Sequence, residues 1–164
     1  MYKSKGFTLI EVMVVVVIMS IMVGTVMLTF PDRNKDLLKE DAERFTALVS
    51  LAQDEAILQS RDLAIAINED GYEFFSRENT SWLPFAEEPF SPRLVSGLAT
   101  SELYLEGVDV KLQSQQKTKP QIVIYSSGEI TPFSYSFGYK GKSNVTLTFD
   151  GGGDAKQEYK FEEE

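Results

Sequence analysis

The residues best placed for chemistry lie at the N-terminus, where Gly6 precedes an apolar run that begins at Phe7 and contains one carboxylate, Glu11. A charged carboxylate in a membrane helix costs about 2 to 3 kcal/mol near the centre and less near an end, so a counter-ion is needed. Cleavage after Gly6 would create an amine on Phe7, four residues and about 6 Å of helix from Glu11. If the chain is cut there, the new amine can pair with Glu11 of the same or a neighbouring chain and so supply the counter-ion.

The segment that would position these groups is the apolar run from Phe7 to Phe30. It is about 24 residues long and would span roughly 36 Å as a helix, enough to cross a hydrocarbon layer of about 30 Å with some tilt. Lys3 and Lys5 precede it, so the N-terminus is expected in the cytoplasm and the following domain outside. Two alternatives remain open: a secretory signal peptide, whose apolar region is usually shorter, and a plain single-span anchor, which leaves Glu11 unexplained.

The composition restricts the chemistry of the remaining domain. The chain has no cysteine and no histidine, so it lacks disulfides, the commonest metal ligand and every Ser-His or Cys-His pair. Its net charge of −9 would repel nucleic acid. An enzyme that uses the adjacent carboxylates Glu87 and Glu88 is a remote alternative, because no partnered base or nucleophile accompanies them. No catalytic residue, metal or cofactor is expected.

Beyond the apolar run, the periodicity first predicts a helix. Apolar residues recur every three or four positions from Asp36 to Gln59, so this segment should form an amphipathic helix that is covered on one side. Pro31 would mark a kink between this helix and the apolar one. The predicted stripe consists of Leu38, Ala42, Phe45, Val49, Ala52 and Ala56, widened by Leu48 and Leu51.

After Ser60 the apolar period changes to two, which is typical of β-strands. The segments from Leu63 to Ile67 and from Tyr72 to Phe75 flank a polar turn and predict a hairpin. Further strands are predicted at Leu103 to Leu112 with a bulge at Gly107, Gln121 to Tyr125, Phe133 to Tyr139, Val145 to Phe149, and Lys156 to Phe161. Residues 63–164 should therefore be rich in β-structure.

Two patterns in this β-rich part have alternative interpretations. The alternating aromatic residues from Phe133 to Tyr139 are expected to face the core, although an aromatic platform for sugars or bases would show the same alternation. The glycine-rich segment from Asp150 to Asp154 is expected to be a hairpin turn, with a calcium-binding loop as the alternative.

A long stretch between Arg77 and Ser101 shows no clear period and contains Trp82, Phe85 and Phe90. Irregular loops of this length in compact domains are often functional. These aromatic side chains either pin the loop to the sheet or form a docking surface. We regard this loop as the candidate contact for a partner subunit or an exported protein.

The N-terminal sequence resembles a known processing signal. The residues Lys5-Gly6-Phe7-Thr8-Leu9-Ile10-Glu11, followed by an apolar run, are similar to the prepilin motif of type IV pilins and type II secretion pseudopilins. Two internal segments resemble the H-type minor pseudopilins of type II secretion: Leu51 to Ile57, and Ile122 to Phe133.

The resemblance implies an α+β, pilin-like fold in which a long N-terminal helix packs against a C-terminal antiparallel β domain of two sheets. It implies that residues 1–6 are a cytoplasmic leader that a prepilin peptidase removes, that Phe7 is N-methylated, and that Glu11 guides assembly. Residues 7–30 would form the transmembrane and fibre-core helix, and residues 31–164 the periplasmic domain.

The function implied by the resemblance is that of a minor subunit near the tip of a periplasmic pseudopilus, which helps to export folded proteins through an outer-membrane secretin. The implied location is the bacterial inner membrane, which the chain would cross once. The implied partners are other major and minor pseudopilins, the peptidase and N-methyltransferase, and the inner-membrane assembly platform, with the secretin and exported proteins as further candidates. The main rival is a minor type IV pilin for pilus assembly or DNA uptake. The absence of cysteine and the acidic end Glu162 to Glu164 argue against that rival.

Overall fold

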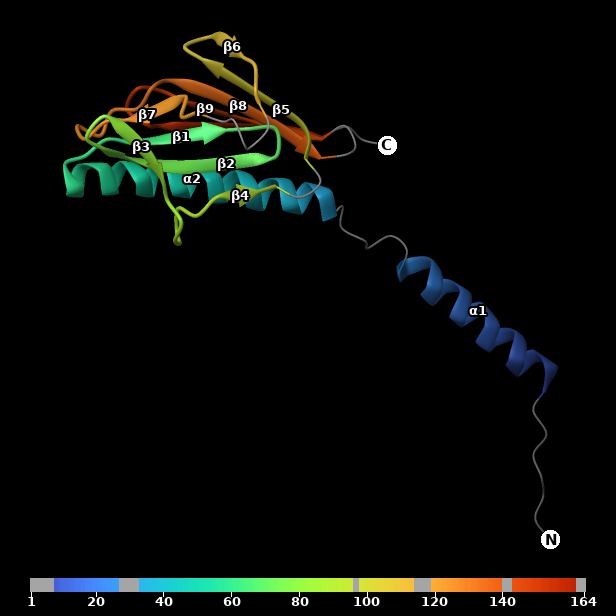
Figure 1. The fold of residues 1–164 in the computed structure, drawn as a ribbon. Coiled ribbons are helices and arrows are strands. Elements are labelled where there is room, and N and C mark those ends of the chain that lie inside the picture. Colours follow the sequence, from blue (N-terminus) through green and yellow to red (C-terminus); the bar gives the residue numbers. More distant parts are fainter. Residues whose placement is uncertain (1–7, 27–32, 96–97, 114–118, 140–142, 162–164) are drawn as a thin grey trace. The chain divides into compact units, whose positions relative to one another are not determined.

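The computed structural model describes residues 8–26, 33–95, 98–113, 119–139 and 143–161. The chain divides into two compact units, Met1–Arg33 and Asn34–Glu164. The first contains helix α1 (Leu9–Val26), and the second contains nearly all of helix α2 (Arg33–Gln59) and two β-sheets (Figure 1). The strands are β1 (Leu63–Ile67), β2 (Gly71–Glu78), β3 (Ser81–Pro84), β4 (Arg93–Leu94), β5 (Leu98–Leu105), β6 (Val108–Val110), β7 (Ile122–Ile124), β8 (Phe133–Tyr139), β9 (Asn144–Phe149) and β10 (Ala155–Lys160).

Both sheets are antiparallel. Sheet A has the order β3-β2-β1-β7, with β4 paired to β2, and sheet B has the order β10-β9-β8-β5-β6. The predicted hairpin from Leu63 is confirmed as β1 and β2, and the strands predicted near Gln121, Phe133, Val145 and Lys156 are confirmed as β7 to β10. The α+β class with two sheets is therefore confirmed.

Helix α2 runs along the sheets and supplies one wall of the core (Figure 1). All six residues of its predicted central stripe are fully buried, and they share one cluster with the inward faces of both sheets. The helix ends at Gln59 because Ser60 takes a left-handed φ of 50°. The amide of Arg61 then donates to the carbonyl of Ala56 over 3.1 Å, and this bond closes the helix with a Schellman motif.

Leu51 does not extend the buried stripe, contrary to the prediction. Its side chain is 43% exposed, whereas Val49 is fully buried. At about 100° per residue, Leu51 lies about 200° around the helix from Val49, on the side that the sheets do not cover. The other predicted extension, Leu48, is buried.

Phe45 forms the centre of the aromatic core. Its ring centroid lies 4.8 Å from Tyr72 of sheet A and 5.4 Å, 6.1 Å and 6.3 Å from the rings of Tyr135, Phe149 and Phe133 of sheet B. The alternating aromatic residues of β8 are buried, so their core interpretation is confirmed. One helix side chain therefore joins both sheets.

The predicted single strand from Leu103 to Leu112 is wrong. The structure has a hairpin there, in which β5 pairs with β6 and Leu105 lies opposite Val108. The intervening residues Glu106 and Gly107 have φ values of 50° and 83°, so Gly107 is part of a tight turn and not a bulge. Two consecutive positive φ values are typical of a type I′ turn, which matches the twist of paired strands.

The stretch from Arg77 to Ser101 is also more regular than predicted. It contains β3 and β4, which both pair with β2, and the first half of β5. The close approach of β4 needs a glycine at position 71, because a Cβ there would lie 1.9 Å from the carbonyl oxygen of Arg93. Prolines in this stretch argued against strands in the sequence. They are compatible with the observed strands because proline is tolerated at strand edges and ends.

Gln53 of α2 links two turns from different sheets. Its Nε2 donates to the carbonyl of Gly128, in the turn after β7, over 2.9 Å and to the carbonyl of Gly152, in the turn between β9 and β10, over 3.1 Å. In the second turn, Asp150 Oδ1 accepts the amide protons of Gly152 and Asp154 over 2.9 Å and 3.0 Å. This segment is therefore a hairpin turn, as predicted.

Buried tyrosines make the fold sensitive to alkaline pH. Burial raises the pKa of Tyr72 from 10.0 to about 12 and also raises the pKa of Tyr135 and Tyr139. As the pH rises past 10, the unfolded chain loses these phenol protons while the folded chain keeps them, so stability should fall between pH 10 and about 12. Circular dichroism and tyrosinate absorbance, followed together in a pH titration, should show late ionisation that coincides with unfolding. Full ionisation near pH 10 in a chain that stays folded would contradict this expectation.

Some predictions fall on residues outside those described. The kink at Pro31 is one of them, so the continuity of α1 and α2 stays a prediction. The expected apolar helix from Phe7 to Phe30 likewise begins and ends beyond α1. For the part of the chain that is described, no helix has both the length and the hydropathy of a membrane span.

Candidate functional site

Glu11 lies in the first turn of α1. The carbonyl of Thr8 accepts the amide protons of Glu11 and Val12 over 3.0 Å and 3.4 Å, so the helix begins directly after Thr8. The Glu11 side chain is exposed. The cleavage residues Gly6 and Phe7 lie outside the described residues, so the structure does not place the expected amine.

The described side chains of α1 are apolar on every side of the helix and exposed in the single chain. Exposure ranges from 43% at Val15 to 79% at Leu9 among the large apolar residues. A helix that is apolar all round is normally buried in a membrane or in other protein. Glu11 is the one charged residue between Leu9 and Val26, so it is the carboxylate that such burial would desolvate.

The loop predicted as a partner contact is held against the domain. Phe90 is 5% exposed, and its ring lies 5.2 Å from Phe74 in the core and 5.1 Å from the half-buried Phe85. Trp82 belongs to a different cluster, on the other face of sheet A, where it stacks against the guanidinium of Arg77 at 5.5 Å. The structure therefore brings Phe85 and Phe90 together and places Trp82 apart from them.

Beside this loop lies a cleft of about 360 Å³ that sequence reasoning did not identify. Leu51 and Glu55 of α2 form one wall, and the loop from Phe85 to Phe90 forms the other. Leu51, which the periodicity placed in the buried stripe, lines this cleft instead.

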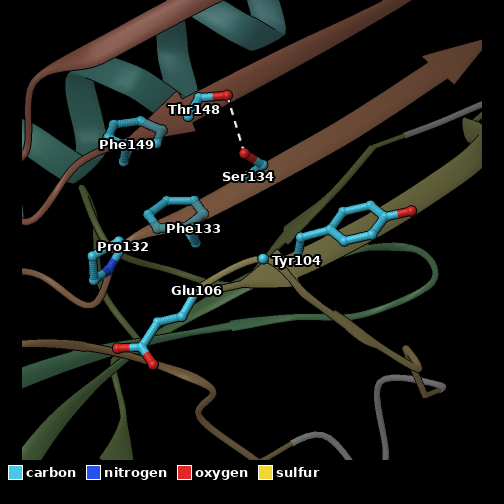
Figure 2. Close-up of a pocket in the computed structure, with 8 residues that line it drawn as sticks. Tyr104, Glu106, Pro132, Phe133, Ser134, Thr148 and Phe149 are labelled. Atoms are coloured by element: carbon cyan, nitrogen blue, oxygen red, sulfur yellow. Dashed lines mark hydrogen bonds between the residues drawn. The ribbon is translucent and has the colours of Figure 1, made fainter.

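A second hollow, of about 250 Å³, opens beside the β5–β6 turn. Its floor contains the stacked rings of Phe133 and Phe149, whose centroids are 4.5 Å apart. Figure 2 shows the hydroxyls of Ser134 and Thr148 above them, joined by a hydrogen bond of 3.0 Å. These hydroxyls bond to each other, and the other polar side chains that line the hollow are Tyr104 and Glu106.

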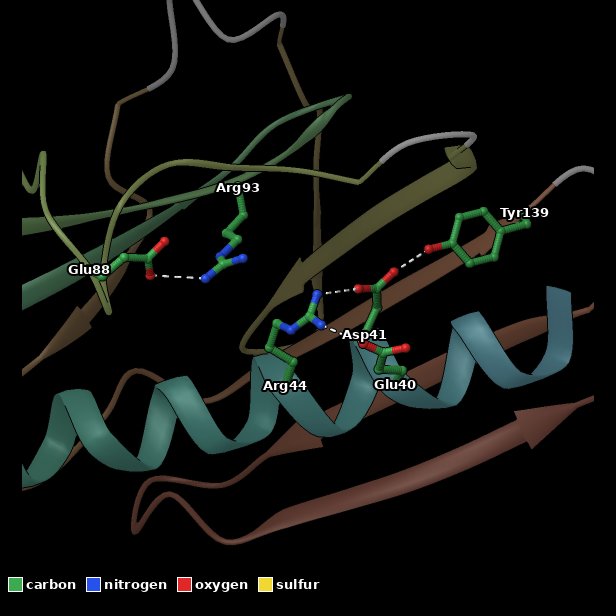
Figure 3. Close-up of polar contacts among 6 residues, drawn as sticks. All are labelled: Glu40, Asp41, Arg44, Glu88, Arg93 and Tyr139. Carbon is green, nitrogen blue, oxygen red and sulfur yellow. Dashed lines mark hydrogen bonds and ion pairs between the residues drawn. The ribbon is translucent and has the colours of Figure 1, made fainter. Parts of the chain in front are cut away.

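Polar contacts join α2 to sheet B and stabilise the loop that contains Glu88 (Figure 3). The hydroxyl of Tyr139 in β8 donates to Asp41, which also accepts a hydrogen bond from Arg44 over 3.1 Å. Arg44 reaches Glu40 as well, over 2.6 Å. On the loop, Arg93 donates to Glu88 over 2.9 Å, so this carboxylate pairs with a permanent cation.

The part of the chain that the structure describes contains no group of three or more acidic, histidine or cysteine residues that could hold a metal ion. The calcium alternative at Asp150 therefore finds no support, since its Oδ1 atom is already used by two backbone amides.

An apolar N-terminal helix with one carboxylate, followed by an amphipathic helix on two antiparallel sheets, defines a pilin-like protein. Residues 1–27 match the prokaryotic N-terminal methylation motif, and residues 41–155 match the family described as type II transport protein GspH. The chain belongs to this GspH family.

Relatives support the assignment over most of the chain. The type II secretion system protein H of Pseudomonas aeruginosa is 33% identical over 162 residues, which cover 93% of this chain and 94% of the relative. A structure of the minor pseudopilin EpsH of Vibrio cholerae matches with a TM-score of 0.60 and 25% identity, over 74% of this chain and 94% of that one. The solution structure of Escherichia coli GspH gives 0.60 and 25%, over 77% and 91%. The motif and the family together indicate a membrane-anchored periplasmic protein.

Proposed function

We propose that this chain, as a minor pseudopilin of the type II secretion system, enters a periplasmic fibre through its N-terminal helix after cleavage between Gly6 and Phe7. The helix from Phe7 to Phe30 crosses the inner membrane once, with the N-terminus in the cytoplasm. After cleavage and N-methylation of Phe7, the helix leaves the lipid and packs among the helices of other pseudopilins. Glu11 then pairs with the amine of a neighbouring subunit.

The observation that carries this proposal is the position of Glu11 in the first turn of an otherwise apolar, exposed helix. A carboxylate that enters an apolar environment costs about 2 to 3 kcal/mol unless a cation accompanies it. The described part of α1 contains no cation, so the partner must come from outside this helix. The processed amine of another subunit has the right charge and lies at the same end of its own helix.

Further partners follow from the same role. We propose contacts with a prepilin peptidase and N-methyltransferase, with the inner-membrane assembly platform, and at the fibre end with the secretin or exported proteins.

We also propose a structural role without catalysis. The ion pair of Glu88 with Arg93 supports it, because it occupies one of the two carboxylates of the acidic pair Glu87 and Glu88. The family match supports secretion over a minor type IV pilus.

Intact mass spectrometry and N-terminal sequencing of the protein extracted from membranes with native processing enzymes test the proposal. The expected chain begins with N-methylated Phe7. A Gly6→Leu variant is the matched control: a bulky side chain next to the cleaved bond should block the peptidase and leave Met1 in place. A wild-type chain that retains Met1, or that is cut beyond Met22, would overturn the proposal.

A further inference from the structure

The cleft between α2 and the loop leaves an apolar surface uncovered. Leu51 on the helix is 43% exposed, and the half-buried Phe85 and the exposed Pro89 face it from the loop. Two turns of helix earlier, the same side of α2 is covered by polar contacts of Arg44 instead. Two turns later on the same side, Leu58 is also exposed, so the apolar surface of α2 extends past the cleft toward the helix end.

The cleft is formed before anything binds to it. Phe90 anchors the loop in the core through Phe74, and the Phe85 ring packs against Phe90 at a tilt of 48°, with 5.1 Å between the centroids. The backbone amide of Phe85 donates to the carbonyl of Phe74 over 2.9 Å, and the guanidinium of Arg61 lies 6.0 Å from the Phe85 ring. A ligand would not need to order this wall, which lowers the entropic cost of binding.

The rim of the cleft is acidic. Glu55, Glu87 and Glu88 line it, and Arg93 neutralises Glu88 alone over 2.9 Å. Within the described residues, neither Glu55 nor Glu87 forms an ion pair; Glu55 accepts a hydrogen bond from the neutral amide of Gln59. Among the described residues, two carboxylates therefore line the cleft without an ion pair.

The acidic rim of the cleft indicates the chemistry of the segment that would bind there. A second copy that presented the same face would bring equal carboxylates together, in a chain whose net charge is already −9. A polypeptide segment with a lysine or arginine next to an apolar side chain fits both features: the apolar group covers Leu51, and the cation pairs with Glu55 and Glu87.

We propose that this cleft, lined by Leu51, Glu55 and the loop from Phe85 to Phe90, binds a cationic-apolar segment of a different subunit in the same fibre. The proposal rests on the pseudopilin role and adds the chemistry by which this subunit selects one neighbour. Assembly through Glu11 joins helices, whereas the cleft joins the folded domains.

Site-specific photocrosslinking of the full chain in secreting cells tests this contact. A photoreactive p-benzoylphenylalanine replaces Leu51 in one strain and Asp54, an exposed residue outside the cleft, in the control strain. The position of Leu51 should give one dominant crosslink to another pseudopilin, at a peptide that contains a lysine or arginine beside an apolar residue. Equal crosslinking from both positions, or a crosslinked peptide without a cation, would overturn the proposal.

Charge reversal provides the second test. The double variant Glu55→Lys with Glu87→Lys should lower the crosslink yield about tenfold, and Asp54→Lys should leave it unchanged. Replacing the partner's cation with glutamate should restore the yield of the double variant. If the double variant is poorly made, Glu55→Gln with Glu87→Gln removes the charge without reversing it. An unchanged yield in a folded double variant would contradict the proposal.

The same samples separate this proposal from the pseudopilin role, because N-terminal sequencing reads the processing of Phe7 independently of the crosslink. Normal processing without a crosslink rejects the cleft alone, whereas an unprocessed chain rejects the assembly route.

Discussion

Replacing Glu11 with leucine should remove the subunit from the fibre while leaving its domain folded. In an assembled fibre, the amine of a neighbour would then face an apolar residue. An uncompensated charge in such a setting costs about 3 kcal/mol, which corresponds to about 100-fold less incorporation. Co-purification with the other pseudopilins and the amount of secreted protein measure the effect. The second unit, Asn34–Glu164, is compact without this segment, so its resistance to protease should not change.

A Met13→Leu variant is the matched control, because it changes an exposed apolar side chain of the same helix without changing its charge. It should co-purify and support secretion like the original chain. Normal secretion and normal co-purification of the Glu11→Leu variant would rule out a role of this carboxylate in assembly. Loss of folding in that variant would show that Glu11 acts through stability instead.

Truncation of Phe45 to alanine should have the largest effect on the fold. The side chain is fully buried and contacts aromatic rings of both sheets, so its removal leaves a cavity where α2, sheet A and sheet B meet. Phenylalanine-to-alanine changes in cores typically cost about 3 to 5 kcal/mol, a large share of the stability of one domain. Urea denaturation of the detergent-solubilised chain, followed by circular dichroism, should show a midpoint shifted strongly to lower urea.

Tyr125→Ala serves as the comparison, since that ring is 45% exposed and its contacts with the next turn are made by the backbone. It should lower the free energy of unfolding by less than about 1 kcal/mol. Similar losses for both variants would mean that Phe45 does not have the central packing role that its ring contacts indicate.

The sequence predicted the elements that depend on local periodicity. The stripe from Leu38 to Ala56 and the alternation in β8 both reflect burial of one face, and burial of one face is what these periods encode. The processing motif could also be recognised in the sequence, because it is a short contiguous segment. Its cleavage residues, Gly6 and Phe7, remain predictions.

The features that the sequence did not predict depend on contacts between distant residues or on one turn. The β5–β6 hairpin was missed because Glu106 and Gly107 interrupt an apolar alternation for only two residues. The cleft was missed because its walls, Leu51 and the loop from Phe85, meet only through tertiary packing. Tyr139 and Asp41 likewise pair across 98 positions of the chain.

The bridging amide of Gln53 has a mechanical consequence for a subunit in a fibre. Because one side chain of α2 holds a turn from each sheet, a force that reaches the domain through this helix is shared between both sheets. The stripe on α2 adds contacts along most of the helix length, so a pull along the helix axis would load them in shear, many at a time. Contacts that must break together resist sliding of the helix along the sheets better than contacts that break one after another. Helix α2 should therefore transmit force to both sheets at once.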